Sequence, residues 1–241
     1  MRSYKARGVV LHTVKYGENS LVAYLLTDLL GRENYLVQGI RTAKGKGNRA
    51  ALFQPLFLLE FEGYETPRSQ LHRMKEVRSF RPLATIPFDA RKSTVSLFMA
   101  EVLYRLVREV EPQSPLFDFV CRAVAALDGL QEGVANSHLW FLVQMSAFLG
   151  FYPGNEYLPE ARFDIREGLF VPGIPSHPFM LSPENTHILH RLMACSEAEL
   201  GAVKLNRGQR VEFLDGMLSY FGYHLDAIHH VRSLHILREV F

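Results

Sequence analysis

The sequence predicts an α+β protein in which a five-stranded barrel at residues 1–80 precedes an α-helical domain at residues 81–241. The first eighty residues contain five short runs of alternating or β-branched side chains, separated by turn residues. From residue 95 onward, apolar residues recur instead at intervals of three and four, which is the spacing of one helix face. Charge is also uneven. Residues 1–80 hold 13 Lys and Arg against 7 Asp and Glu, whereas the remainder holds 14 against 18.

The strands of the barrel are expected at residues 9–14, 21–27, 34–40, 53–64 and 68–80. In the last run, Leu71, Arg73, Lys75 and Val77 are expected on one face, and His72, Met74, Glu76 and Arg78 on the other. No helical pattern interrupts the first four runs. This favours a small, closed or partly closed barrel of the OB-fold type, whose commonest use is oligonucleotide binding.

The helical domain is expected to contain helices at about residues 95–110, 117–127, 139–149, 188–192, 208–221 and 231–240. Residues 151–183 differ, because six prolines punctuate them. A short hairpin of residues 163–165 and 168–171 fits within this segment. We therefore expect a small irregular insertion at residues 151–183 of the helical domain.

The overall composition indicates a cytoplasmic protein. Cys121 and Cys195 are the two cysteines of the chain and lie far apart, which is no disulfide framework and suits a reducing compartment. No apolar run of the signal-peptide type follows the charged N-terminus. The most apolar stretches, residues 21–30 and 139–152, are too short or too polar to span a bilayer, so no membrane partner is expected.

A basic loop between two barrel strands is the first candidate site for nucleic acid. Residues 41–49 carry four cations, two glycines and no acid, and the cations are Arg41, Lys44, Lys46 and Arg49. Such a loop can follow a phosphate backbone and release its counterions. Alternatively, it is only the tip of a hairpin. Further candidate contacts, on strands whose faces are unassigned, are Lys15, Arg32, Arg73 and Lys75.

Aromatic residues are interleaved with these charges, and bases stack on exposed aromatic rings. The six are Tyr4, Tyr16, Tyr24, Tyr35, Phe53 and Tyr64. Most barrel aromatics belong to the core, so one of the six at most is expected to face DNA, and Tyr35 is the choice.

Neither a metal site nor a catalytic site is expected. His187, His190 and Cys195 could offer three ligands, but no fourth stands at zinc-finger spacing. The sequence contains no nucleophile elbow, phosphate-binding loop, metalloprotease helix or dinucleotide-binding glycine motif. The expectation is a protein without a cofactor, without a metal and without enzymatic activity.

Many short motifs, in order, carry a resemblance that covers essentially the whole chain. They include Ala6-Arg7-Gly8-Val9-Val10-Leu11, Tyr16-Gly17-Glu18-Asn19-Ser20, Thr27-Asp28-Leu29-Leu30-Gly31-Arg32, Val37-Gln38-Gly39-Ile40-Arg41, Leu52-Phe53-Gln54-Pro55-Leu56, Glu101-Val102-Leu103-Tyr104, Gly150-Phe151-Tyr152-Pro153 and Leu181-Ser182-Pro183. In these motifs the sequence resembles the bacterial recombination mediator family RecO.

The resemblance implies a role in DNA repair. Members of the family bind single- and double-stranded DNA, anneal complementary strands, work with RecR, and help RecA to displace single-strand-binding protein (SSB). A receptor for the acidic SSB tail needs an apolar pocket rimmed by cations. The candidates here are Arg91, Lys92, Phe98 and Arg105.

Two departures from the family stand out. Many members carry a four-cysteine zinc site after the position of Gly150–Pro153, but residues 154–180 contain no cysteine here. A metal-free counterpart held by proline-rich packing is therefore expected. Gln38 also stands where the family often has lysine.

The sequence is also compatible with two other classes of function. One is an OB-fold protein that binds RNA, which a preference for RNA through 2′-hydroxyl contacts would indicate. The other is a small-molecule enzyme, which a deep pocket with several perturbed titratable groups would indicate.

Overall fold

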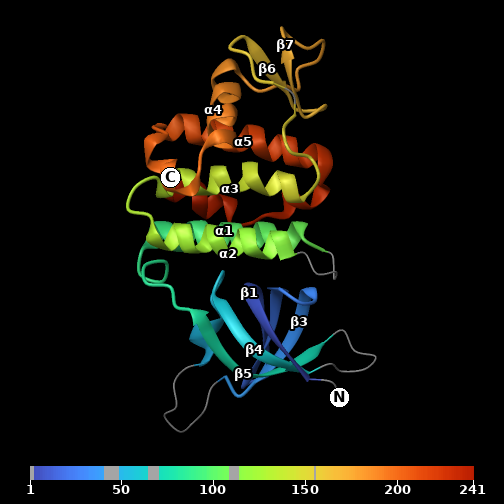
Figure 1. The fold of residues 1–241 in the computed structure, drawn as a ribbon, viewed down its shortest axis with the longest axis vertical. Coiled ribbons are helices and arrows are strands. Elements are labelled where there is room, and N and C mark those ends of the chain that lie inside the picture. The colour runs from blue at the N-terminus through green and yellow to red at the C-terminus, as the bar shows by residue number, and fades with distance from the viewer. Residues whose placement is uncertain (1–2, 41–48, 65–70, 109–113, 155) are drawn as a thin grey trace. The chain divides into compact units, whose positions relative to one another are not determined.

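The computed structural model describes residues 3–40, 49–64, 71–108, 114–154 and 156–241 (Figure 1). The chain divides into two compact units, Met1–Asp128 and Gly129–Phe241. We call them the N-terminal and the C-terminal unit and describe each by itself. Strands give way to helices between Arg81 and Ala90, inside the N-terminal unit. That residues 1–80 form a separate nucleic-acid-binding domain stays a prediction.

The barrel consists of five strands, which are β1 (Ser3–Tyr16), β2 (Ser20–Thr27), β3 (Gly31–Gln38), β4 (Leu58–Tyr64) and β5 (His72–Arg81). Their order around the closed barrel is β1-β2-β3-β5-β4, and β1 also pairs with β4. All pairings are antiparallel except that of β3 with β5. The α+β class and the five-stranded N-terminal barrel are thus confirmed.

The interior of the barrel is filled by inward-facing side chains of all five strands. In β2 these are Leu21, Ala23 and Leu25, and β3 adds Tyr35 and Val37. Successive residues of a strand point to opposite faces, so the even-numbered residues of β2 and β3 point outward. Burial of this apolar surface is the main favourable term in folding the barrel.

Two irregularities change which residues face outward. The register of β1 against β2 shifts between Val10 and His12. In β5, Glu76 has a φ of 49°, and the β4–β5 register shifts beside it. An extra residue of this kind is a β-bulge, which moves the following side chains to the other face. Val77 consequently packs against the core, so its expected position on the face of Arg73 and Lys75 was wrong.

The chain between β3 and β4 contains a short 3-10 helix, η1 (Arg49–Phe53). The expected strand at residues 53–64 therefore begins five residues later, at Leu58. Phe53 is buried in the barrel core as the last residue of η1.

Two helices complete the N-terminal unit, namely α1 (Ala90–Leu106) and α2 (Ser114–Gly129). The side chain of Asp89 caps α1 by accepting hydrogen bonds from the backbone N–H groups of Arg91 and Lys92. Such a cap satisfies donors that have no partner inside the helix. The hydroxyl of Ser96, on α1, donates to the carbonyl of Pro55 at 3.0 Å. Helix α1 therefore contacts the segment that leads into β4.

The C-terminal unit is built around α3 (Val134–Phe148), which is buried on almost every side, as its sequence indicates. Helices α4 (Pro183–Ala194), α5 (Arg207–His224) and α6 (Leu234–Val240) follow, with 3-10 helices η2 (Glu197–Ala202) and η3 (Asp226–His230) between them. Asn136 anchors η2 to α3, because its side-chain amide donates to the carbonyl oxygens of Leu200 and Val203. None of the helices in the described ranges is long and apolar enough to cross a membrane.

The small insertion contains a two-stranded sheet, β6 (Ala161–Asp164) and β7 (Leu169–Pro172). Its packing is aromatic rather than rich in proline. The ring of Phe163 lies 5.3 Å from that of Phe170 and 5.0 Å from that of Tyr220. Phe163 and Phe170 are both buried, whereas Pro172 and Pro178 are exposed. Apolar rings attach this hairpin to α5.

Candidate nucleic-acid interface

Of the basic loop, Arg41, Lys44 and Lys46 lie outside the described residues, so their predicted contacts with DNA stay predictions. Arg49, the fourth cation, is the first residue of η1 and is half-buried. The loop begins after Ile40, whose backbone N–H donates to the carbonyl of Asn19 at 3.1 Å. Its first end is thereby fixed beside the turn that joins β1 to β2.

Tyr35 does not face solvent, so the prediction that it contacts DNA was wrong. Its side chain is 0% exposed and lies edge-on to Phe61, with 4.9 Å between the ring centroids. Its hydroxyl forms a hydrogen bond of 3.0 Å with the hydroxyl of Tyr4. Burial raises the pKa of Tyr35, and the hydrogen bond with Tyr4 adds to that shift. Tyr35 is therefore a core residue with a satisfied hydroxyl.

Arg32 is held by α1. Its Nη1 donates to the carbonyl oxygens of Tyr104 and Val107, at 2.7 and 2.9 Å. Its guanidinium carbon lies 4.4 Å from the centroid of the Tyr104 ring, a cation–π arrangement. Burial lowers the pKa of this guanidinium, while Tyr104 and Tyr24 act in the opposite direction. Because the guanidinium of Arg32 is engaged in these contacts with α1, we do not retain Arg32 as a phosphate contact.

The other three second-rank cations are exposed. Lys15 stands opposite Leu21 where the β1–β2 hairpin ends. Arg73 stands opposite Leu36 of β3, on the outward side of β5. Lys75 lies with its Nζ 5.1 Å from the ring centroid of Tyr64 and stands opposite Glu62. Lys15 lies at the β1–β2 hairpin, whereas Arg73 and Lys75 both lie on β5, where Arg73 stands between Leu36 of β3 and Tyr64 of β4.

The outer surface of β1, β4 and β5 contains a groove in which charges of both signs alternate. It is lined by the cations Lys5, Arg7 and Arg78 and by the acids Asp28, Glu60, Glu62 and Glu76. Arg78 already pairs with Glu60, with 2.7 Å between Nε and Oε1. A phosphate backbone gains little from a groove that holds more carboxylates than cations. We therefore do not expect this groove to be the part of the barrel that binds a phosphate backbone.

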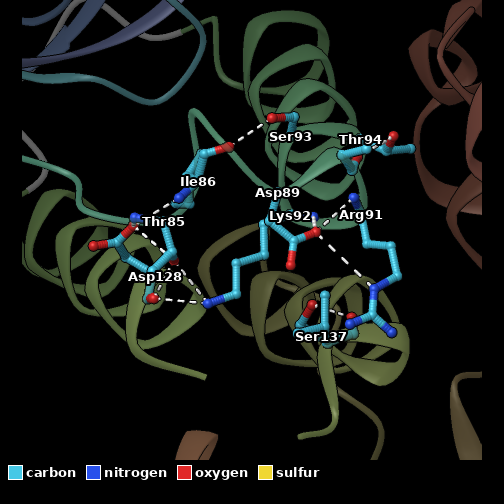
Figure 2. Close-up of polar contacts among 11 residues, drawn as sticks. Thr85, Ile86, Asp89, Arg91, Lys92, Ser93, Thr94, Asp128 and Ser137 are labelled. Atoms are coloured by element: carbon cyan, nitrogen blue, oxygen red, sulfur yellow. Dashed lines mark hydrogen bonds and ion pairs between the residues drawn. The ribbon is translucent and has the colours of Figure 1, made fainter. Parts of the chain in front are cut away.

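Of the four residues predicted to form a pocket for the SSB tail, two are internal. Phe98 is 0% exposed and Lys92 is 3% exposed. The Nζ of Lys92 donates to Thr85 Oγ1 and to the carbonyl of Asp128, both at 2.8 Å (Figure 2). Lys92 and Phe98 point into the fold, so the four predicted residues do not form a surface pocket together.

The other two predicted residues, Arg91 and Arg105, differ in exposure. Arg91 has a side chain that is 59% exposed, beside Asp89. Arg105 forms an ion pair with Glu101, with 3.0 Å between Nε and Oε1. Arg91 is therefore the most exposed of the four side chains, and its ion pair with Asp89 is long, with 4.0 Å between Nε and Oδ1.

The carboxylate of Asp128 organises the linker between barrel and helices. It accepts hydrogen bonds from the backbone N–H groups of Ala84, Thr85 and Ile86, at 2.8 to 2.9 Å (Figure 2). Burial alone would raise the pKa of Asp128, but these hydrogen bonds outweigh it and lower the pKa. Together with Lys92, Asp128 ties the linker to the ends of α1 and α2. This cluster is structural, and sequence patterns gave no sign of it.

The donors around the insertion do not fit a zinc site of the kind many relatives carry. Residues 154–180 contain no cysteine. The nearest candidates are engaged otherwise: His177 pairs with Asp164 at 3.1 Å, and His190 stacks on Tyr157 with 4.1 Å between ring centroids. Within the described ranges, no group of three or more potential ligands converges. The insertion is held by side-chain packing and not by a donor set suited to zinc.

Comparison with known proteins identifies the family. Residues 1–83 match the model of the recombination protein O N-terminal region, and residues 87–234 match that of the C-terminal region. The chain is 36% identical to the DNA repair protein RecO of Bacteroides fragilis and to that of Phocaeicola vulgatus. It is 32% identical to the RecO of Flavobacterium psychrophilum. Each alignment covers 98% of both chains. The chain therefore belongs to the RecO family of bacterial DNA repair proteins.

Proposed function

We propose that this protein is a recombination mediator that binds single- and double-stranded DNA and anneals complementary strands. With RecR, it helps to load RecA onto single-stranded DNA coated with SSB. The observation that carries the proposal is the full-length match to the RecO family, a recombination mediator and not an enzyme. We place this activity in the cytoplasm, at the nucleoid.

The physical basis of annealing is electrostatic. Two DNA strands repel each other through their phosphates, and a barrel with surplus cations reduces that repulsion by replacing counterions. The bases stay free to pair, so no catalytic group and no nucleotide hydrolysis is required. We assign the backbone contacts to Arg41, Lys44, Lys46 and Arg49, with Lys15, Arg73 and Lys75 in support.

The acidic SSB tail is proposed as a protein ligand, with RecR as a second protein partner and RecA acting downstream. Since Lys92 and Phe98 are internal, Arg91 is the residue of the original four that we keep for the tail. An exposed guanidinium can donate two parallel hydrogen bonds to a carboxylate.

The test is annealing of two complementary oligonucleotides coated with SSB, followed by fluorescence without ATP. We expect the protein to accelerate annealing, and the acceleration to fade as salt rises. A variant with alanine at positions 41, 44, 46 and 49 should fold normally and bind DNA with a shallower salt dependence. The expected change is about 0.7 in the slope of log affinity against log salt for each lost contact to single strands.

A control variant replaces Arg122 and Arg166, two exposed cations outside the barrel, by alanine. It should anneal like the parent. A folded loop variant whose salt slope equals that of the parent would remove the loop from the interface. Tighter binding to RNA than to DNA of the same sequence would instead favour an RNA-binding role.

A further inference from the structure

One side of the barrel presents apolar side chains to solvent. Strands β1, β2, β3 and β5 place Val14 opposite Val22, Val22 opposite Leu36, and Leu36 opposite Arg73. These side chains point outward, because the alternate residues of β2 and β3 fill the core. With neighbouring strands about 4.8 Å apart, this row of four extends roughly 14 Å across the sheet.

A second row lies at the hairpin end of the same face. Here Tyr16 stands opposite Ser20, which in turn stands opposite Gln38. Tyr16 is 57% exposed, and Val14, two residues earlier, is 45% exposed. Gly17 follows with a φ of 65°, and among the described residues no heavy atom beyond its two chain neighbours lies within 4 Å of the position that a Cβ would take there. The turn is held to Ile40 at Asn19, whereas the ring of Tyr16 beside it is exposed.

The opposite end of this face is covered by α1. The His12 ring lies 4.7 Å from that of Tyr104, and the Tyr24 ring lies 5.2 Å from it. Helix α1 thus shields the outward aromatic residues at one end of the face and leaves Tyr16 open at the other.

The burial of the other barrel aromatic residues also points to Tyr16 as the base contact. Of the six barrel aromatics considered as base contacts, Tyr35 and Phe53 are buried and Tyr4, Tyr24 and Tyr64 are half-buried, whereas Tyr16 is exposed. An exposed tyrosine presents a large flat surface that loses little conformational entropy on binding. Of these six rings, that of Tyr16 is therefore the most open to a base.

Charge separates this face from the mixed groove on β4 and β5. The two rows contain one cation, Arg73, and no carboxylate, and the nearest acid along the chain is Glu18 in the turn. The groove beyond β1 holds four acids. A polyanion is therefore repelled less on the outward face that contains Tyr16 than in that groove.

We infer that the outward face of β1–β3 at the hairpin end is a stacking platform for single-stranded DNA. Tyr16 stacks on one base, the aliphatic row of Val14, Val22 and Leu36 supports the neighbouring base, and Arg73 contacts a phosphate. The inference rests on the proposed function, since it names where on the barrel a single strand lies. Stacking tolerates any base, as a protein without sequence preference requires.

The experiment measures binding of a fluorescent single-stranded oligonucleotide by the parent and by Tyr16→Ala across a series of salt concentrations. We expect Tyr16→Ala to weaken binding by about 5- to 160-fold, the range found for loss of one base–aromatic stack. The salt slope should not change, since a phenol releases no counterion. Arg73→Ala should instead reduce that slope by about 0.7.

Two controls isolate stacking. Phe88→Ala removes an aromatic side chain that is 85% exposed and lies outside the barrel strands, and it should bind like the parent. An oligonucleotide with abasic sites retains the phosphates but offers no ring. On that ligand the parent and Tyr16→Ala should bind equally.

The outcomes separate the inference from the proposed function. If the parent fails to bind single-stranded DNA at all, the proposed function falls first. If the parent binds and Tyr16→Ala binds equally well, the platform is overturned. An equal loss on the abasic ligand would overturn stacking as the cause. Should Tyr16→Ala unfold, Tyr16→Trp decides: its fluorescence is quenched on binding if position 16 stacks, and is unchanged if it does not.

Discussion

The guanidinium of Arg32, on strand β3, donates two hydrogen bonds to the end of helix α1 and rests on the ring of Tyr104. The last carbonyl groups of a helix have no partners inside it, and a cation there also opposes the negative end of the helix dipole. A residue that the sequence offers as a phosphate contact thus joins barrel and helix within the N-terminal unit.

Arg32→Ala should destabilise the N-terminal unit without a direct effect on DNA. Hydrogen bonds to a charged donor contribute about 1.5–3 kcal/mol, so we expect a loss of roughly that size in the free energy of unfolding. Urea denaturation followed by circular dichroism measures it. Arg73→Ala, at an exposed position, should change stability by less than about 0.5 kcal/mol. Equal stability of Arg32→Ala and the parent would contradict the role of Arg32 as a helix cap.

Lys92→Met tests the internal role of a second cation. Methionine retains most of the volume of lysine but leaves the carbonyl of Asp128 and the hydroxyl of Thr85 without their donor. The expected loss is about 2–3 kcal/mol in the free energy of unfolding. Arg91→Ala, one residue earlier and exposed, is the control and should leave stability unchanged. If Lys92→Met instead weakened binding of an SSB-tail peptide at full stability, Lys92 would have to be accessible to the peptide.

Tyr35→Phe separates a core role from a DNA contact. The variant loses only the hydrogen bond with Tyr4, and a neutral hydrogen bond contributes about 1 kcal/mol to stability. DNA affinity should equal that of the parent, since the ring is buried. Reduced affinity with unchanged stability would return Tyr35 to the interface.

His138 predicts a dependence of stability on pH. It lies on α3, and complete burial lowers its pKa from 6.5 to about 3, with a further contribution from Arg210. The unfolded chain therefore binds a proton at pH 5 that the folded chain does not. This favours unfolding by about 2 kcal/mol at pH 5 relative to pH 8.

His138→Gln is neutral in both states and should lose less stability between pH 8 and pH 5 than the parent does. Urea unfolding at the two pH values gives the difference, in which the remaining titratable groups cancel. Identical pH dependence of the two proteins would mean that His138 is protonated in the folded state.

The barrel and the main helices follow from the sequence because alternation and helical spacing report burial directly. The choice between the two faces of a strand does not follow so easily. In β3 large apolar side chains occur on both faces, Tyr35 and Val37 on one and Leu36 on the other. Alternation around Leu36 alone could not say which of these side chains fill the core. The residues packed against this strand, which are distant in the chain, decide it.

Contacts over long sequence distances explain the other errors. Lys92 lies 36 residues from Asp128 and Arg32 lies 72 from Tyr104, so no local pattern announces either contact. The bulge at Glu76 depends on the partner strand, and its positive φ has no glycine to signal it. Tyr16 could have been found, because it directly precedes a turn glycine, where a strand leaves the sheet.

The parallel pairing of β3 with β5 is short, covering Tyr35 with His72 and Leu36 with Arg73. The pairing of β2 with β3 runs instead from Ser20 and Gln38 to Thr27 and Gly31. The β3–β5 pairing that closes the barrel is therefore much shorter than the β2–β3 pairing. Local opening of the β3–β5 pairing breaks few backbone hydrogen bonds, so we expect its amides to exchange with solvent faster than those of the meander β1–β2–β3. Leu36 and Arg73 belong both to this pairing and to the outward face that contains Tyr16. Single-stranded DNA bound on that face would therefore also stabilise the β3–β5 pairing.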